Sequence, residues 1–420
     1  MPSDRTTVTE VGTALGMLGL ADVDAALRTR TPVMRSLSPE TWDRLASLRA
    51  GGVYDTEFHA AWENGRAFLA AADGLRGRLP LVVEWKGTGR APGDEVAPVD
   101  LRVDHVYLVS CKYLSDILFN VSPSHVFDYL LLTGQSRSAR TTRDLLPGGG
   151  DWYAQVAPAE YQALYEVVRL AIRHEEAAGA GHAHHPGTTP SPPRTAPSTP
   201  VSGRTAAAVS LPGLEDATGP DATGQPVGNG SGAVASPAGP RLAAPPAALH
   251  ALPARATDLS AEQRDALGQW LRPGWPPGGK AVYAQLSAAV AHASVRHWEA
   301  AMDVAGGTGE AMLWRLLRMG SAPYFVLGSS AARSLRLRIA TSWDWRQQFQ
   351  LISISMTPQP AGQPRVAWEA LVRDRVTFEL SGITGHIEVR WSHGRFGGLP
   401  EAKGYLDTPH HLVPGYFPLQ

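Results

Sequence analysis

The composition of residues 176–257 constrains this chain more than any other feature. Pro, Ala, Gly, Ser and Thr dominate the stretch, it contains no aromatic residue, and the apolar periodicity of the flanking segments stops there. Such a segment cannot bury enough apolar surface to offset the entropy lost on ordering its backbone. We therefore expect a disordered linker over 176–257, which divides the 420-residue chain into two domains, 1–175 and 258–420.

The bulk composition limits the class of protein. No run of about 18 apolar residues occurs, so we expect no membrane span. The first twelve residues, MPSDRTTVTEVG, lack the basic and apolar regions of a secretory signal. The single cysteine, Cys111, excludes a disulfide framework within the chain and a multi-cysteine zinc site. These features favour a cytoplasmic protein, and the net charge of −1 argues neither for nor against nucleic acid.

The first domain shows the pattern of an α/β fold. Helix-start signals open residues 36–51, where Ser38 precedes Pro39, and helical spacing continues over 55–75. A short apolar strand over 79–87 is followed by a Gly/Pro-rich loop and by β-prone residues 98–115. Two further helices are expected over 122–134 and 157–176.

The second domain changes from helical to β periodicity. Helical patterns over 260–271, 280–304 and 309–320 precede a series of alternating segments. Six strands are expected there, over residues 324–328, 334–343, 348–358, 365–373, 376–382 and 385–394. This order predicts an α+β, β-rich domain behind a helical lead-in.

Residues 98–115, PVDLRVDHVYLVSCKYLS, carry charges along a strand-like segment. A two-residue turn after Val103 would place Asp100 opposite Val109 and Lys112 on the other face of the sheet. A three-residue loop over 104–106 instead pairs Asp100 with Ser110 and sets Lys112 diagonally on the same face. In a third layout, 99–113 form one strand beside 79–87, and Glu84 lies next to Asp100. No Gly or Asn marks a turn, so the three layouts stay open.

This segment also carries a motif. Pro98-Val99-Asp100, followed by Ser110-Cys111-Lys112 at the end of an apolar strand, resembles the PD-(D/E)xK (restriction-endonuclease-like) nuclease superfamily over about residues 40–175. The resemblance implies a core of one helix, a mostly antiparallel strand set and a helix. It also implies Mg²⁺-dependent phosphodiester hydrolysis, in which Asp100 and Glu84 hold the metal and Lys112 assists the attacking water. Ser110 stands where an acid is usual, and Glu63 on the preceding helix is a further metal ligand.

The chemistry supports these residue types independently. Mg²⁺ near a scissile phosphate requires hard oxygen ligands, and a nearby ammonium group offsets phosphate charge and orients water. Lysine occurs at only four positions, which makes a specific role for Lys112 more plausible. The alternatives are a solvated strand face of no catalytic role and, less favoured, a Cys111 thiolate beside Lys112 that acts as a nucleophile.

A second charged stretch lies near the end of the chain. Arg and His alternate with apolar residues around Trp391, a pattern that suits contacts to phosphates and stacked bases. The candidate substrate-binding residues are Arg390, Trp391, His393, Arg395 and Lys403. The alternative is a surface strand with paired charges and a tryptophan packed into the core.

Two functions follow from these patterns. The first is a metal-dependent nuclease, with DNA as the favoured substrate, in a restriction, repair or phage-defence role. The second is a non-catalytic adaptor or scaffold subunit that binds protein partners in a multi-component assembly. The missing acid at Ser110 favours the second.

Overall fold

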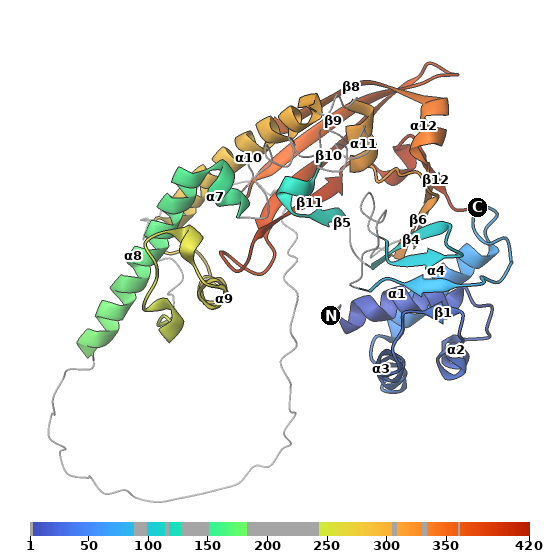
Figure 1. Ribbon diagram of the computed structural model, residues 1–420, viewed down its shortest axis with the longest axis horizontal. Coiled ribbons are helices and arrows are strands. Elements are labelled where there is room, and N and C mark those ends of the chain that lie inside the picture. The colour runs from blue at the N-terminus through green and yellow to red at the C-terminus, as the bar shows by residue number, and fades with distance from the viewer. Residues whose placement is uncertain are drawn as a thin grey trace, which may run out of the picture.

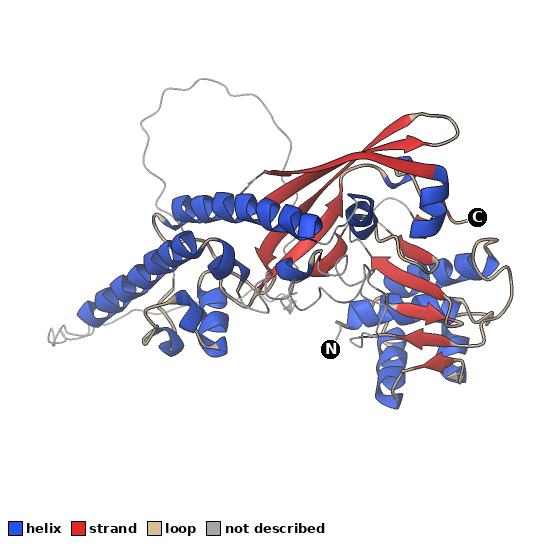
Figure 2. Ribbon diagram, turned by 45° about the horizontal axis from the view of Figure 1, so that its top comes forward, coloured by secondary structure: helices blue, strands red, loops and turns tan. Residues whose placement is uncertain are grey.

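The computed structural model describes residues 3–87, 99–113, 117–127, 151–182, 243–304, 309–329, 334–359 and 362–420. These residues form two β-sheets, one of seven strands and one of five, with helices packed against each (Figures 1 and 2). The mixed helix and sheet content confirms the predicted α/β character.

Four helices cover one face of the seven-stranded sheet: α1 (Asp4–Gly16), α2 (Val23–Thr29), α3 (Pro39–Ala50) and α4 (Asp55–Ala70). The helix start predicted at Ser38 is confirmed, because its side chain accepts a hydrogen bond from the Thr41 amide at 3.2 Å. The core beneath these helices includes Phe58, Phe68 and Val109.

The seven-stranded sheet has the order β1-β2-β3-β4-β6-β7-β12. Its strands are β1 (Met34–Arg35), β2 (Val83–Trp85), β3 (Leu101–Val103), β4 (Tyr107–Tyr113), β6 (Tyr324–Ser329), β7 (Ser334–Ile339) and β12 (Tyr416–Pro418). β2, β3 and β4 form an antiparallel meander, and β6 runs parallel to β4. A parallel neighbour requires a crossover connection, which the helices between β4 and β6 provide.

The five-stranded sheet is antiparallel throughout, with the order β5-β11-β10-β9-β8. Its strands are β5 (Ile117–Val121), β8 (Phe349–Pro358), β9 (Arg365–Asp374), β10 (Leu380–Trp391) and β11 (Pro400–Leu406). The helices that complete this half of the molecule are α7 (Trp152–Val156), α8 (Pro158–His182), α9 (Ala261–Trp270), α10 (Gly279–Val304), α11 (Gly309–Leu316) and α12 (Ser342–Gln348). α10 packs against both β8 and β9.

The predicted division into domains 1–175 and 258–420 does not match the sheets. β4 pairs with β6, and β5 pairs with β11, so each sheet contains strands from both sides of the expected linker. The linker boundaries also need correction. α8 continues to His182, and residues 243–257 contain two 3₁₀ turns that bury Leu249 and Ala256 in the core. Residues 183–242 lie outside the described part of the chain.

Other elements differ from the prediction in detail. The strands expected over 376–382 and 385–394 are one strand, β10. Position 385, inside this strand, requires glycine, because a Cβ there would collide with the Trp368 ring on β9. The helix expected over 122–134 is described only to Phe127, as a 3₁₀ turn over Pro123–His125. Among the described helices, none combines the length and apolar character needed to cross a membrane.

Candidate active site

The β3–β4 hairpin decides between the layouts left open by the sequence. Val103 pairs with Tyr107 and Leu101 pairs with Val109, so a three-residue loop over 104–106 joins the strands. This register places Asp100 opposite Ser110 and sets Lys112 on the same face of the sheet.

Asp104 explains how this loop forms without glycine. Its backbone has a positive φ of 50°, a conformation that Asp tolerates better than most residues. Its carboxylate accepts hydrogen bonds from the amides of Leu81 at 2.7 Å and Val82 at 3.1 Å, and it pairs with Arg78 at 2.6 Å. Asp104 therefore anchors the hairpin to the segment before β2 and has a structural role.

Asp100 is held in place by the neighbouring strand. Its Oδ2 accepts hydrogen bonds from Ser110 Oγ at 3.1 Å and from the Cys111 amide at 2.6 Å. Burial raises the pKa of Asp100, while Lys112 and these two donors oppose that rise. Ser110 and the Cys111 amide thus fix the orientation of the Asp100 carboxylate.

Lys112 lies close enough to Asp100 for each to affect the other's ionisation. Burial lowers the pKa of Lys112, the positive charge of Arg318 lowers it further, and Asp100 raises it. Protein atoms surround both side chains closely, yet both residues keep part of their surface exposed. The predicted association of Asp100 with Lys112 is therefore present in the fold.

Glu10 on α1 is a third member of this cluster, and the sequence analysis missed it. Trp85 on β2 donates its indole Nε1–H to Glu10 Oε2 at 2.6 Å. Burial and the nearby charge of Asp100 raise the pKa of Glu10 to about 8, against the Trp85 hydrogen bond and Lys112, which lower it. The available signal was an acid among apolar residues, flanked by Val8 and Val11, after a Ser3 helix cap.

Arg318 completes the cluster from the residues that follow α11. The residue is 2% exposed and has a positive φ of 59°. Its Nη1 donates to the Tyr324 hydroxyl at 3.1 Å, and its Cζ lies 5.3 Å from the centre of that ring. Its charge lowers the pKa values of both Asp100 and Lys112. We name Glu10, Asp100, Lys112 and Arg318 the buried charge cluster.

Glu84 on β2 and Glu63 on α4 are the other two predicted acids. Glu84 is opposite Arg102 in the strand register, and its carboxylate lies 3.5 Å from both Lys86 Nζ and His105 Nδ1. Glu63 is exposed on α4. Within the described residues, no group of three His, Cys, Asp or Glu side chains could hold a metal ion. Glu63, Glu84 and Asp100 therefore do not form one ligand set in this structure.

Cys111 does not have the environment of a nucleophile. Its side chain points to the helix-covered face of the sheet, where the residue is 9% exposed within the core. Burial raises the thiol pKa well above its ordinary value, and the charges of Asp100 and Glu10 raise it further. A thiolate at this position is strongly disfavoured.

The residues predicted to bind substrate are spread over the five-stranded sheet. Arg390 is opposite Glu401, and Lys403 is opposite Glu388, so acids alternate with bases on this face. Trp391 packs among aromatic rings, 4.5 Å from Tyr153 and 5.0 Å from Phe396 between ring centres. Arg395 donates to the Leu271 carbonyl and lies over Trp275, which gives it a structural role at the end of α9. His393 is exposed in the turn after β10.

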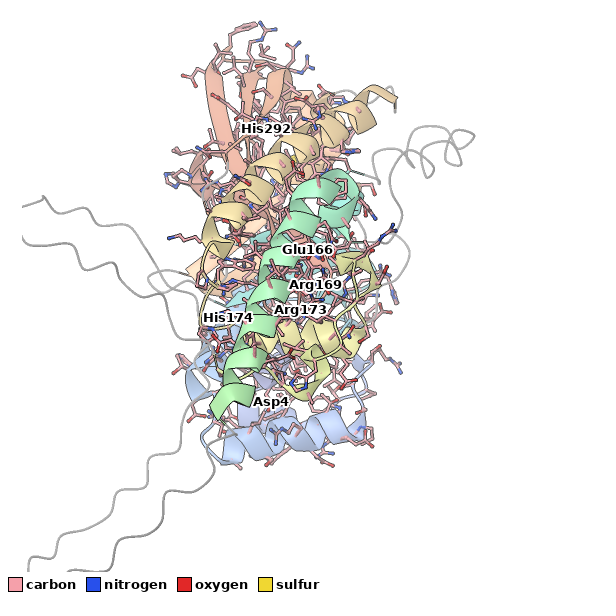
Figure 3. The ribbon with its side chains drawn as sticks, turned by 90° about the vertical axis from the view of Figure 1, so that its left-hand side faces the viewer. Asp4, Glu166, Arg169, Arg173, His174 and His292 are labelled. Carbon is pink, nitrogen blue, oxygen red and sulfur yellow. The ribbon has the colours of Figure 1, made fainter. Side chains whose placement is uncertain are left out.

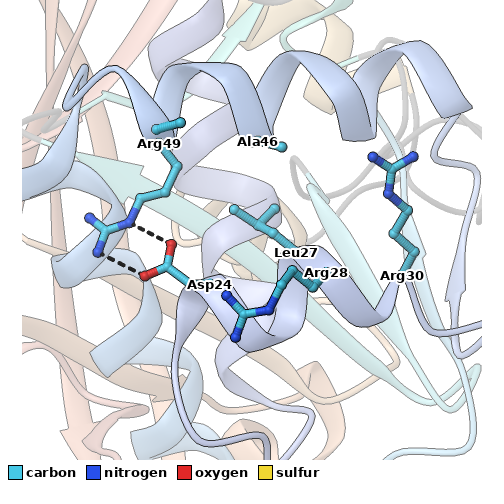
Figure 4. A pocket seen from close by; sticks show the side chains of 7 residues that line it. Asp24, Leu27, Arg28, Arg30, Ala46 and Arg49 are labelled. Carbon is cyan, nitrogen blue, oxygen red and sulfur yellow. Dashed lines mark hydrogen bonds and ion pairs between the residues drawn. The ribbon is translucent and has the colours of Figure 1, made fainter.

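Two further groups of basic side chains lie away from the cluster. Arg28, Arg30 and Arg49 line an open depression of about 390 Å³ between α2 and α3, where Asp24 pairs with Arg49 (Figure 4). On α8, Arg169 pairs with Glu166 at 2.7 Å, and Arg173 and His174 follow along the same helix (Figure 3). Most of these charges are balanced by neighbouring acids.

Comparisons with known proteins do not assign this chain to a family. No protein-family model matches the sequence, and neither the curated proteins nor the solved structures contain a significant match. The arguments below therefore depend on the buried charge cluster and on the sheet that carries it.

Proposed function

We propose that this protein is a divalent-metal-dependent hydrolase of nucleic-acid phosphodiesters, with Asp100 and Glu10 as metal ligands and Lys112 beside the attacking water. The observation that carries the proposal is that these three side chains, from the β3–β4 hairpin and α1, lie near enough to affect one another's ionisation. Partly buried charged groups that perturb each other's ionisation are characteristic of functional sites.

The fold around the cluster supports the proposal. Helices precede an antiparallel meander of β2, β3 and β4, and helices follow it before β6. A helix, a mostly antiparallel strand set and a helix are what the resemblance to the PD-(D/E)xK nucleases implies. Asp100 stands at the start of β3 and Lys112 near the end of β4, as the order of the motif requires.

The donor set fits Mg²⁺. The two acids supply hard carboxylate oxygens, and Mg²⁺ is commonly held by one or two carboxylates together with water and phosphate oxygens. A bound cation would supply Lewis-acid stabilisation of charge on the phosphate. It would also relieve the unfavourable proximity of Glu10 and Asp100, which raises the pKa of Glu10.

Side chains of the protein supply the other contributions to catalysis in this proposal. Ser110 and the Cys111 amide hold Asp100 in one orientation, so that its carboxylate needs little rearrangement on metal binding. The lowered pKa of Lys112 brings its Nζ closer to neutrality, which suits it to accept a proton from water. Arg318 places a fixed positive charge behind both residues.

Contacts to the nucleic acid are part of the same proposal. Arg390 and Lys403, on one face of the inner strands β10 and β11, and His393, in the turn after β10, would supply cationic or hydrogen-bonding groups to a phosphate backbone. A role in restriction, repair or phage defence, with DNA as substrate, agrees with such a combination of cutting and binding surfaces.

Cleavage of labelled DNA by the full chain, with and without Mg²⁺, tests the proposal. Asp100→Asn, Glu10→Gln and Lys112→Met should each lower Mg²⁺-dependent cleavage by about 100-fold or more, because each removes a ligand or the proton acceptor. Glu63→Gln is the matched control, since Glu63 is an exposed acid on α4, and its activity should stay within about twofold.

A second function has one specific observation in its favour. Ser110 replaces a metal-binding acid and donates to Asp100, so the cluster is also consistent with an internal polar network in an adaptor or scaffold subunit. Calorimetry distinguishes the two: a nuclease site binds Mg²⁺, and Asp100→Asn abolishes the binding. Absent Mg²⁺ binding together with absent cleavage would overturn the hydrolase proposal in favour of the adaptor.

A further inference from the structure

β8 is an edge of the five-stranded sheet. It pairs with β9 on one side, and no described residue pairs with its other side (Figure 1). An edge strand exposes a row of unpaired amide and carbonyl groups, which is a template for pairing with another strand. At ten residues, β8 is long for an edge.

The usual protections of an edge strand are weak here. Residues 347–364 contain no charged side chain, although charged residues make up 18% of the whole chain. A bulge between Leu351 and Ser353 disturbs the first part of β8, and Pro358 ends it. The segment from Ser353 to Thr357 is regular, uncharged and available for pairing.

A shallow depression beside this edge could accept a side chain from a strand that pairs with β8. Leu351, Ile352, Ser353 and Ile354 line this depression of about 400 Å³ together with Gly309 and Glu310 at the start of α11. Gly309 lies against the Ile354 side chain, so the bottom of the depression is apolar. A strand added to β8 would continue the sheet and place an apolar residue over this depression.

Exposed apolar side chains continue this surface at one end of β8. The β9–β10 turn exposes Val376 and Phe378 by 78% and 69%, and Leu380 at the start of β10 is 60% exposed. Asp374 fixes the turn, because its Oδ1 accepts hydrogen bonds from the amides of Val376 and Thr377 at 2.7 and 2.9 Å. The turn is therefore a preformed apolar projection beside the start of the edge strand.

We propose that the outer edge of β8 binds the same edge of a second copy of this chain, antiparallel and across a two-fold axis. A register centred on Ile354 places Ser353 of one copy opposite Ser355 of the other and brings the two Ile354 side chains together at the depression. The two sheets then form one ten-stranded sheet. The apolar turn of each copy lies near the Pro358 end of the other.

The charge pattern favours a second copy over other occupants. Across a two-fold axis, residues near the centre face their own counterparts, so any charge there would repel itself. An uncharged strand avoids this repulsion, and opposed serines can form cross-strand hydrogen bonds. A nucleic acid would require unpaired basic residues, whereas the nearby Arg373 donates to Gln350 and Arg375 to the Phe349 carbonyl.

Sedimentation analysis of the full chain from about 1 to about 100 µM tests the proposal. The wild type should form dimers, and Ser353→Lys/Ser355→Lys should lower the association constant by at least about 100-fold, because the substitutions oppose like charges across the axis. Both serines are exposed, so the variant should fold normally. Ser47→Lys/Ala50→Lys on α3 adds the same charge at exposed positions and should leave the dimer intact.

A charge-reversal mixture excludes a purely structural effect. The double-lysine chain mixed with Ser353→Glu/Ser355→Glu should form a one-to-one heterodimer, although each chain alone is monomeric. A wild type that is monomeric throughout, a lysine variant that still dimerises, or a mixture that does not recombine would each overturn the proposal. Binding only to a strand of another protein would do so as well. None of these outcomes depends on whether the candidate site hydrolyses nucleic acid.

Discussion

We name the face of the five-stranded sheet that carries Glu388, Arg390, Glu401 and Lys403 the outer face. The outer face and the buried charge cluster both contain several charged side chains, but these side chains are paired differently in the two regions. On the outer face, two bases of β10 and β11 lie opposite acids: Arg390 faces Glu401, and Lys403 faces Glu388. In the cluster, the donors that hold Asp100 are a hydroxyl and an amide, and Arg318 donates to the Tyr324 hydroxyl rather than to a carboxylate. The cluster therefore holds charges that the protein has not neutralised pairwise.

This difference shows why charge density in a sequence is a poor guide to a site. The stretch around Arg390 is the denser of the two in charged residues, yet its charges form partly exposed ion pairs at 3.6 and 3.8 Å, and we expect each to contribute little free energy. The cluster contains only four charges, drawn from distant parts of the chain, in surroundings that exclude much of the water. Charged groups that are incompletely paired in such surroundings are electrostatically unfavourable, and a bound ligand of suitable charge would stabilise them.

The largest difference in stability is expected when a lysine is replaced by methionine in each of the two regions. Lys112→Met should lower the free energy of unfolding by about 3 kcal/mol, because it leaves Glu10 and Asp100 closely surrounded without their nearest ammonium group. Lys403→Met, on the outer face, should lower it by about 1 kcal/mol or less. Urea unfolding of the two variants measures both values, and equal values would remove the distinction between the regions.

A smaller effect is expected from pH. The pKa of Glu10 in the folded protein, about 8, is above its ordinary value of 4.5, so the folded state binds this proton more tightly than the unfolded state. The stability linked to Glu10 is complete below pH 4.5 and is lost as the pH rises through about 8. Compared with Glu10→Gln, the wild type should therefore lose stability progressively between pH 4.5 and about 8.

Thermal or urea unfolding in matched buffers without divalent cations would measure this pH dependence. Glu388→Gln, on the outer face, is measured alongside as the control for removal of an acid. If the wild-type and Glu10→Gln curves are parallel from acid to alkaline pH, Glu10 is ionised normally and the cluster is less desolvated than its geometry indicates.

The sequence was sufficient for local structure. A helix cap predicted the start of α3, and helical spacing predicted α9, where the structure shows that Ser260 and Gln263 form a reciprocal capping box. The pairing of β4 with β6 could not be predicted in this way, because it joins residues about 200 positions apart and local patterns carry no information about such partners. The low-complexity stretch between them therefore suggested a domain boundary that the sheets do not have.

The candidate site was predictable to the same extent. The motif spacing located Asp100 and Lys112, which the hairpin register brings to one face. Their third partner was misplaced, because Glu63 and Glu84 are close to the motif in sequence and Glu10 is not. Only the packing of α1 against α4 and β4 brings Glu10 to the cluster. Arg318 was missed for the same reason.

The smallest change in the free energy of unfolding is expected for an arginine on the outer face. Arg390→Ala removes the partner of Glu388, which lies 3.6 Å away, and the side chain of Arg390 is 33% exposed. The free energy of unfolding should fall by about 0.5 kcal/mol at low ionic strength and by less in about 1 M salt, where screening acts within about 3 Å. A loss above 2 kcal/mol that persists in high salt would mean that this face also holds unneutralised charge, and the contrast with the buried cluster would then fail.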